Sequence, residues 1–230
     1  MLKRLRLPNT LPRYEEILRH LSCNLNTPIS SLKEYKSIIL EVMDKEKPLL
    51  HARCVCDLQK ILFIKEGQLK LENGLIFEGD GLEEIFGGAD LLALCLCSLG
   101  KDLEEKVGEY FKQNEPLKAI ILDAIGSASL ERKVETVITY LDEEAKRKNW
   151  KLTEKIVPGC GFLSLQDQAK IIELLPSDEL GVKLNEQFML IPRKSLIFLV
   201  GMGEKAEKRI RLSPCSFCPR RDKCRVKIFH

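Results

Sequence analysis

The sequence feature that most constrains the fold is a helical pattern that starts at Pro116 and reaches about Lys148. Apolar side chains recur along it at the spacing of one helix face, at Ile120, Ile121, Ala124, Ala128, Val134, Val137 and Leu141. Its N-terminal part, AIILDAIGSAS, is almost entirely small or apolar. The sequence therefore predicts one long helix whose N-terminal part is deeply buried.

Shorter helices and strands precede and follow this segment. Strand patterns occur at 49–58, 61–65, 69–72, 89–100 and within 178–203, and helical patterns at 30–45, 81–86, 101–113 and 164–175. We expect loose structure before residue 28, where prolines interrupt the pattern, and a loop over 149–163. Strands alternate with helices of very different lengths, which is not a regular βαβ series. We therefore predict the α+β class, a single domain with a mostly antiparallel sheet packed with helices.

The charge distribution divides the chain. Its 230 residues are enough to bury a core, and we expect an N-terminal extension (1–29), an α+β domain (30–203) and a basic, Cys-rich tail (204–230). The tail has nine basic residues against three acidic ones, a net charge of +6, which leaves −3 for the rest of the chain. Only Phe217 and Phe229 are aromatic in the tail, too few for base stacking, so we do not expect nucleic acid as a partner.

The N-terminus and the apolar runs indicate where the protein works. Met1 to Leu7 is basic, but Pro8 follows where a signal peptide would need an apolar core. The longest apolar runs, near 91–99 and 196–202, are much shorter than the roughly 20 residues of a membrane helix. We therefore expect a cytoplasmic protein without membrane spans.

The chain holds nine cysteines, and three of them form a C-x2-C-x5-C pattern in the tail: Cys215, Cys218 and Cys224. In a cytoplasm, thiols are buried hydrophobes, metal ligands or redox groups. The tail spacing favours a metal or cluster site, with thiol redox chemistry and a purely structural role as the alternatives.

Four more cysteines lie in strand patterns, as the pairs Cys54 with Cys56 and Cys95 with Cys97. Residues two apart on a strand point to the same face of the sheet. Their neighbours are apolar, so we expect buried core thiols.

The segment VPGCGFLSLQDQAKIIELLPSDELGVKLNEQFMLIPRKSLIFLVGMG, residues 157–203, resembles the activation domain of cobalamin-dependent methionine synthase in its stand-alone form. The matching positions are Pro158, Gly159, Gly181, Leu184, Glu186, Phe188, Pro192 and Ser195. The segments ADLLALCLCSLGKDLEEKV and AIILDAIGSASLERKVETVITYLDEE are similar to the stand-alone relatives as well. The resemblance covers roughly residues 30–203.

The resemblance implies a function and a set of site residues. Such domains bind S-adenosylmethionine and dock against a cobalamin-binding methyltransferase domain, whose inactive corrinoid is reduced by an electron donor such as flavodoxin or ferredoxin. Lys155 stands where the family has an arginine that holds the ligand's carboxylate, and Glu135 maps to the acid that meets its amino group. The turn made by Val157, Pro158, Gly159, Cys160 and Gly161 corresponds to the one that faces the corrin.

The resemblance also bears on the tail thiols, because it places Cys160 beside the corrin. Cys160 could then complete a four-thiolate set with Cys215, Cys218 and Cys224, which suits either an iron–sulfur cluster or zinc. We predict an accessory protein for reductive activation of a corrinoid methyltransferase. The alternative is a non-enzymatic corrinoid-protein binding module with a structural zinc and no S-adenosylmethionine binding.

Overall fold

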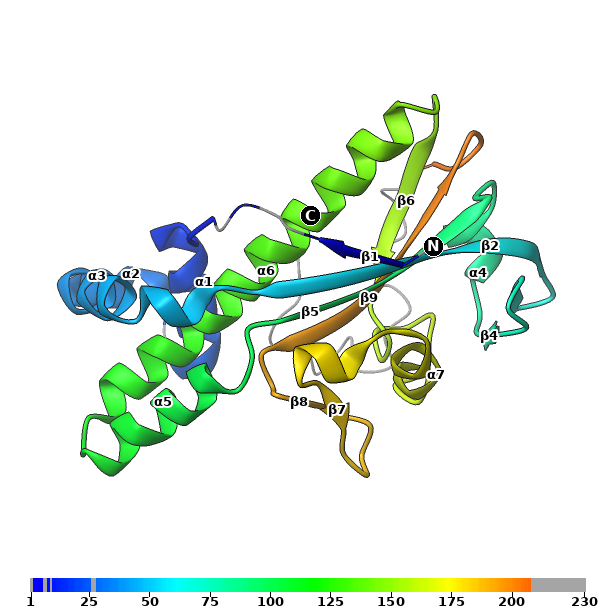
Figure 1. Cartoon of the computed structure of the whole chain (residues 1–230). Helices are drawn as coiled ribbons and strands as arrows, with labels where there is room; N and C mark the ends of the chain where they lie inside the picture. The colour runs from blue at the N-terminus through cyan, green and yellow to red at the C-terminus, as the bar shows by residue number, and fades with distance from the viewer. Residues whose placement is uncertain (1, 6–7, 9, 26–27, 208–230) are drawn as a thin grey trace.

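The computed structural model describes residues 2–5, 8, 10–25 and 28–207, and its centre is an antiparallel sheet (Figure 1). The strand order is β4-β3-β2-β5-β9-β6, with β1 paired to β2 beside this path. The strands are β1 (Leu2–Leu5), β2 (Arg53–Lys65), β3 (Gln68–Leu71), β4 (Ile76–Glu78), β5 (Leu91–Ser98), β6 (Lys151–Ile156) and β9 (Ser195–Gly203). A separate two-stranded sheet joins β7 (Lys183–Leu184) to β8 (Leu190–Ile191).

One strand, β2, organises the sheet. Its residues 53–60 pair with β5, and its residues 61–65 turn back through Glu66 and Gly67 to pair with β3. The two separate strand patterns at 49–58 and 61–65 are therefore one continuous strand. Glu66 and Gly67 make the turn between β2 and β3, and both residues have a positive φ.

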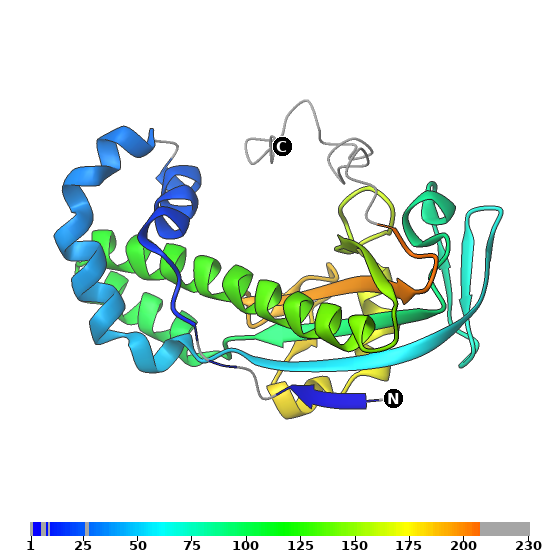
Figure 2. The same cartoon turned by 90° about the horizontal axis from the view of Figure 1, so that it is seen from above.

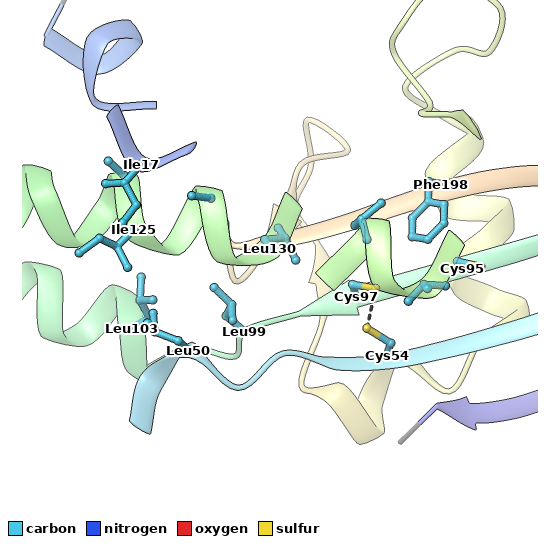
Figure 3. Packing of buried hydrophobic residues seen from close by; sticks show 14 of the residues in the cluster. Ile17, Leu50, Cys54, Cys95, Cys97, Leu99, Leu103, Ile125, Leu130 and Phe198 are labelled. Atoms are coloured by element: carbon cyan, nitrogen blue, oxygen red, sulfur yellow. Dashed lines mark hydrogen bonds between the residues drawn. The ribbon is translucent and has the colours of Figure 1, made fainter. Parts of the chain in front are cut away.

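A layer of helices covers one face of the sheet, and Figure 2 shows the long helix α6 (Pro116–Lys146) running along it. The other helices of this layer are α1 (Tyr14–Leu25), α2 (Ile29–Leu32), α3 (Lys36–Lys45) and α5 (Asp102–Lys112). The helix α6 contacts α1, α3 and α5. Its small and apolar N-terminal part, with Ala124 and Ile125 fully buried, packs into the same core as Phe198 of β9 (Figure 3).

The opposite face of the sheet carries a second apolar core. It packs under α4 (Leu82–Phe86), α7 (Asp167–Leu174) and the loop that follows β6. Val55, Leu94 and Leu199 from the sheet contribute to it, and Phe162 contributes from the loop. Residues of β2 and β5 thus alternate between the two cores, as expected for strands covered on both sides.

The α+β class and the antiparallel sheet are confirmed, and two local expectations are wrong. The residues described before 28 are not all loose, because β1 pairs with β2 and α1 packs on α6 through Ile17 and Leu21. The prolines that suggested looseness precede the helix, where they do not interrupt its hydrogen bonds. The division at residues 29 and 203 stays a prediction.

The second correction is β6, which occupies residues 151–156 of the predicted loop. Its sequence KLTEKI is rich in Lys and Glu, which are depleted in strands. The strand pairs with β9 along one side and buries Leu152 and Ile156. Its register shifts between Leu152 and Lys155, so a simple alternation of apolar and polar residues is absent.

Of the helices that the structure describes, not one has both the length and the apolar composition that crossing a membrane requires.

Candidate functional site

The turn Val157–Gly161 follows β6 directly and is closed by backbone hydrogen bonds. The Cys160 N–H donates to the Val157 carbonyl oxygen at 3.1 Å, and the Gly159 N–H donates to the Leu163 carbonyl oxygen at 2.9 Å. Gly159 and Gly161 have φ values of +87° and +89°, a backbone conformation that residues other than glycine rarely adopt. Cys160 lies between them and is exposed, so the two glycines hold a thiol at the surface.

Phe162 fixes this turn to the rest of the molecule. Its side chain is fully buried in the second core, and its backbone lies against Gly79. A Cβ at Gly79 would come within 1.8 Å of the Phe162 carbonyl oxygen, and one at Gly81 within 2.9 Å of the Phe162 ring. The position of the turn therefore depends on two glycines that are far from it in the sequence.

Lys155 lies on β6 just before the turn, on the helix-covered side. It is half-buried and pairs with Val200 of β9, which belongs to the core beneath α6. Its positive charge reaches the Glu131 carboxylate on α6. The charge of Lys155 therefore acts on Glu131 from the sheet, as the smallest of the contributions that lower the pKa of this carboxyl.

Glu131 is also held by the N-terminal helix. Its Oε2 lies 3.0 Å from Nε2 of His20 on α1, and its side chain is 38% exposed. The hydrogen bond from His20 lowers the pKa of the Glu131 carboxyl, with further lowering from the charges of His20, Arg19 and Lys155. The carboxylate form of Glu131 is therefore favoured, and three elements of the fold meet at this group.

Glu135 lies one helical turn beyond Glu131, in a different environment. Its side chain is 56% exposed and forms an ion pair with Arg132 at 3.6 Å. Arg132 also reaches Glu16 of α1 at 3.4 Å, and Glu16 accepts a hydrogen bond from the Arg13 backbone at 2.7 Å. Glu135 thus belongs to the charge network that fastens α1 to α6.

The structure brings Lys155 and the turn together, as their spacing in the sequence requires, and adds Glu131 and His20. Sequence reasoning missed these two. Glu131 lies four residues before Glu135 and so on the same side of one helix, and only the packing of α6 distinguishes them. His20 gave no signal, because its partner is 111 residues away in the chain.

The predicted metal site is only partly within the described residues. Cys215, Cys218 and Cys224 lie outside them, and Cys160 is described and exposed. Among residues 2–5, 8, 10–25 and 28–207 there is no group of three or more His, Cys, Asp or Glu side chains placed to hold a metal ion. The four-thiolate set therefore stays a prediction.

Two surface hollows of about 480 and 510 Å³ lie elsewhere on the molecule. One is lined by His51, Arg53 and Lys101 among others, and the other by Trp150 and Lys146. Neither includes Lys155, Glu131 or any residue of the turn. These hollows therefore give no separate support to the candidate site.

The described architecture is one α+β unit in which a long helix crosses an antiparallel sheet and a glycine-flanked turn follows the strand at the sheet's edge. A solved structure with this fold is the crystal structure of the MetH reactivation domain bound to AdoHcy. It superposes with a TM-score of 0.67 over 90% of this chain and 80% of that one, at 14% sequence identity. No family model and no curated protein sequence matches the chain. The fold expected from residues 157–203 is confirmed.

Proposed function

We propose that this protein is an accessory protein for reductive activation of a corrinoid (cobalamin) methyltransferase such as methionine synthase. It binds S-adenosylmethionine and docks against the cobalamin domain of its partner. The observation that supports the proposal is a fold shared with the solved reactivation domain bound to AdoHcy, on which Lys155 lies directly before the turn Val157–Gly161 and its charge acts on Glu131.

The two charges suit the amino-acid end of S-adenosylmethionine. Lys155 offers a positive point charge to the ligand's carboxylate, without the two-pronged geometry of an arginine. The helix α6 offers the carboxylate for the ligand's ammonium group. We propose Glu131 for this role because the charge of Lys155 acts on it, with Glu135 one turn away as the alternative. S-adenosylmethionine supplies the methyl group that makes the uphill reduction of the corrinoid irreversible.

The turn serves the docking surface in this proposal. Gly159 and Gly161 carry no side chain, so the backbone around Cys160 can approach a flat macrocycle closely. The exposed Cys160 thiol is accessible as a fourth ligand for a metal or cluster held by Cys215, Cys218 and Cys224. An electron donor such as a flavodoxin or ferredoxin would deliver electrons to the side of the protein that carries this turn.

Calorimetric titration with S-adenosylmethionine tests the ligand site. We expect micromolar binding by the full chain and at least about tenfold weaker binding by Lys155→Ala, because a charge-assisted contact of about 1.5–3 kcal/mol is lost. Lys151→Ala is the matched control, since Lys151 lies exposed on the same strand. Glu131→Gln and Glu135→Gln then identify the acid. If only Glu135→Gln loses binding, Glu135 is the acid that binds the ligand's ammonium group.

The second candidate function is a corrinoid-protein binding module that holds a structural zinc and does not bind S-adenosylmethionine. The observation that favours it is that the Glu131 carboxylate is engaged by another residue of the chain, with its Oε2 3.0 Å from Nε2 of His20. If titration with S-adenosylmethionine gives no heat of binding while the protein still binds a corrinoid protein, the result supports this second function. The iron and zinc content of anaerobically purified protein and of Cys215→Ser/Cys218→Ser tests the predicted metal set in either case.

A further inference from the structure

Four thiols form a compact array beneath the long helix. Cys54 faces Cys97, and Cys56 faces Cys95, as direct partners of the antiparallel pair β2 and β5. All four are buried in the core that α6 covers, and Cys54 is the most exposed of them at 5%. The proposed function uses none of these side chains.

The two pairs differ in how closely their sulfur atoms approach. The Sγ atoms of Cys54 and Cys97 are 2.6 Å apart (Figure 3), and those of Cys56 and Cys95 are 3.2 Å apart. Heavy atoms that are not bonded prefer about 3.5–4.0 Å, whereas a disulfide is about 2.05 Å long. The Cys54–Cys97 separation is closer to the bonded distance than to the contact distance.

The backbone geometry suits a bond at this position. Directly opposed residues in an antiparallel pair have Cα atoms about 4.5–5.5 Å apart. That range lies within the roughly 4.4–6.8 Å that disulfides span. The strands therefore need not move apart or together for Cys54 and Cys97 to join.

Charge also distinguishes the two pairs. Burial in the apolar core raises the pKa of Cys97 well above its ordinary value, and the positive charge of Lys133 acts in the opposite direction. Burial raises the pKa of Cys95 as well, and so do its hydrogen bond with Cys56 and the neighbouring thiols of Cys97 and Cys54. Lys133 is itself buried, and its Nζ donates to the Pro8 carbonyl oxygen at 2.9 Å. Lys133 belongs to α6, so its charge acts on Cys97 only once that helix is packed on the sheet.

We propose that Cys54 and Cys97 form a cross-strand disulfide when the chain folds in the presence of a small-molecule disulfide. The Cys97 thiolate attacks one sulfur of that molecule and releases the first small thiolate. The Cys54 thiolate then attacks Cys97 in the mixed disulfide and releases the second. One protein disulfide forms, the small disulfide is reduced to two thiols, and the two protein protons leave to solvent or to those thiols.

The reaction belongs to folding rather than to the folded state. In the folded protein the four sulfurs lie under α6, and burial raises the pKa of Cys95 and Cys97, which disfavours their thiolates. While β2 and β5 pair before α6 has settled, the same thiols are open to a small disulfide. Once formed, the bond is shielded from reductants by the same helix.

Peptide mapping of refolded wild-type protein tests the proposal. The reduced, unfolded chain is refolded with oxidised glutathione, then alkylated in denaturant and digested with trypsin. Trypsin places Cys54 and Cys56 in the peptide 54–60, and Cys95 and Cys97 in the peptide 71–101. We expect these peptides linked through Cys54 and Cys97, and separated by dithiothreitol. Recovery of Cys54 and Cys97 as alkylated residues, or a link through Cys56 and Cys95 alone, would overturn the proposal.

A matched pair of variants gives an independent readout. Cys54→Ala/Cys97→Ala should lose the link, whereas Cys56→Ala/Cys95→Ala, which removes the same atoms one pair along, should keep it. Closing a loop between positions 43 residues apart restricts the unfolded chain. The oxidised wild type should therefore melt several degrees above its reduced form. An equal melting temperature for both forms of the wild type, with the link present, would show that the bond strains the sheet and overturn the proposed fit.

Discussion

The array formed by Cys54, Cys56, Cys95 and Cys97 and the turn that carries Cys160 place the same side chain in opposite surroundings. The array lies under α6, where burial raises the pKa of Cys95 and Cys97. Cys160 lies at the surface between two glycines with positive φ. The comparison teaches that strand pairing gathers the first set of thiols under α6, which protects them. The backbone conformation of the turn exposes the Cys160 thiol instead.

The comparison predicts a large difference in alkylation of the folded protein. Iodoacetamide at pH 8 should label Cys160 in minutes. The four array thiols should react at least about 1,000-fold more slowly, because they need an opening that costs several kcal/mol. Quantitative peptide mass spectrometry over time gives both rates in one sample.

Denaturant supplies the control for that measurement. In guanidinium chloride the five thiols should react at similar rates, since the protection comes from packing. Fast labelling of Cys95 in the folded state would show that α6 does not seal the array, and the comparison would then fail.

The sequence predicted part of the array and could not predict the rest. Spacing of two residues in a strand places Cys54 with Cys56, and Cys95 with Cys97, on one face, and the prediction of buried core thiols is confirmed. The cross-strand partners depend on the register of β2 against β5. That register is set by packing between distant segments, which spacing within one strand does not contain.

The site shows the same limit. Lys155 and the turn are neighbours in sequence, and the family resemblance over this one short segment grouped them. Glu131 and His20 meet only because α1 packs on α6, and the sequence offered no local pattern for that contact. The strand β6 was missed because its alternation is broken by charged residues and by a shift in register.

A second prediction tests the packing that positions the turn. In Gly79→Ala the new methyl group would meet the Phe162 carbonyl oxygen at 1.8 Å, so the backbone there has to shift. We expect a loss of about 1–3 kcal/mol in the free energy of unfolding, as for other overpacked sites. Urea denaturation followed by circular dichroism measures it.

Gly108→Ala is the matched control for that change. Gly108 lies within α5, and a Cβ there would have no neighbour within 4 Å. It should raise stability by about 0.5–1 kcal/mol, because alanine favours a helix over glycine. Equal stability of Gly79→Ala and the wild type would mean that the turn is not held by Phe162. If the array cysteines of Gly79→Ala stay as protected from alkylation as in the wild type, the substitution has moved the turn and not the array. That result would sharpen the comparison between the two regions.

The smallest predicted effect concerns Glu131 and pH. Its folded pKa is lowered, first by the hydrogen bond from His20 and further by the charges of Arg19 and Lys155. The stabilisation is therefore fully present above the unfolded pKa of about 4.3 and is lost as pH falls through the lower folded value. Because Glu131 is 38% exposed, solvent screening limits the effect to less than about 1 kcal/mol.

Urea denaturation between pH 3 and pH 6 in wild type and His20→Ala measures this contribution. The wild type should lose more stability than the variant as pH falls below about 4.3, since the variant lacks the partner that lowers the Glu131 pKa. Glu131→Gln should show the same flattened profile as His20→Ala, because both remove one interaction. Parallel profiles for all three proteins would mean that His20 does not hold Glu131. The charged contacts that hold the N-terminal helix on α6 would then be those of Glu16, Arg13 and Arg132, beside the apolar packing of Ile17 and Leu21.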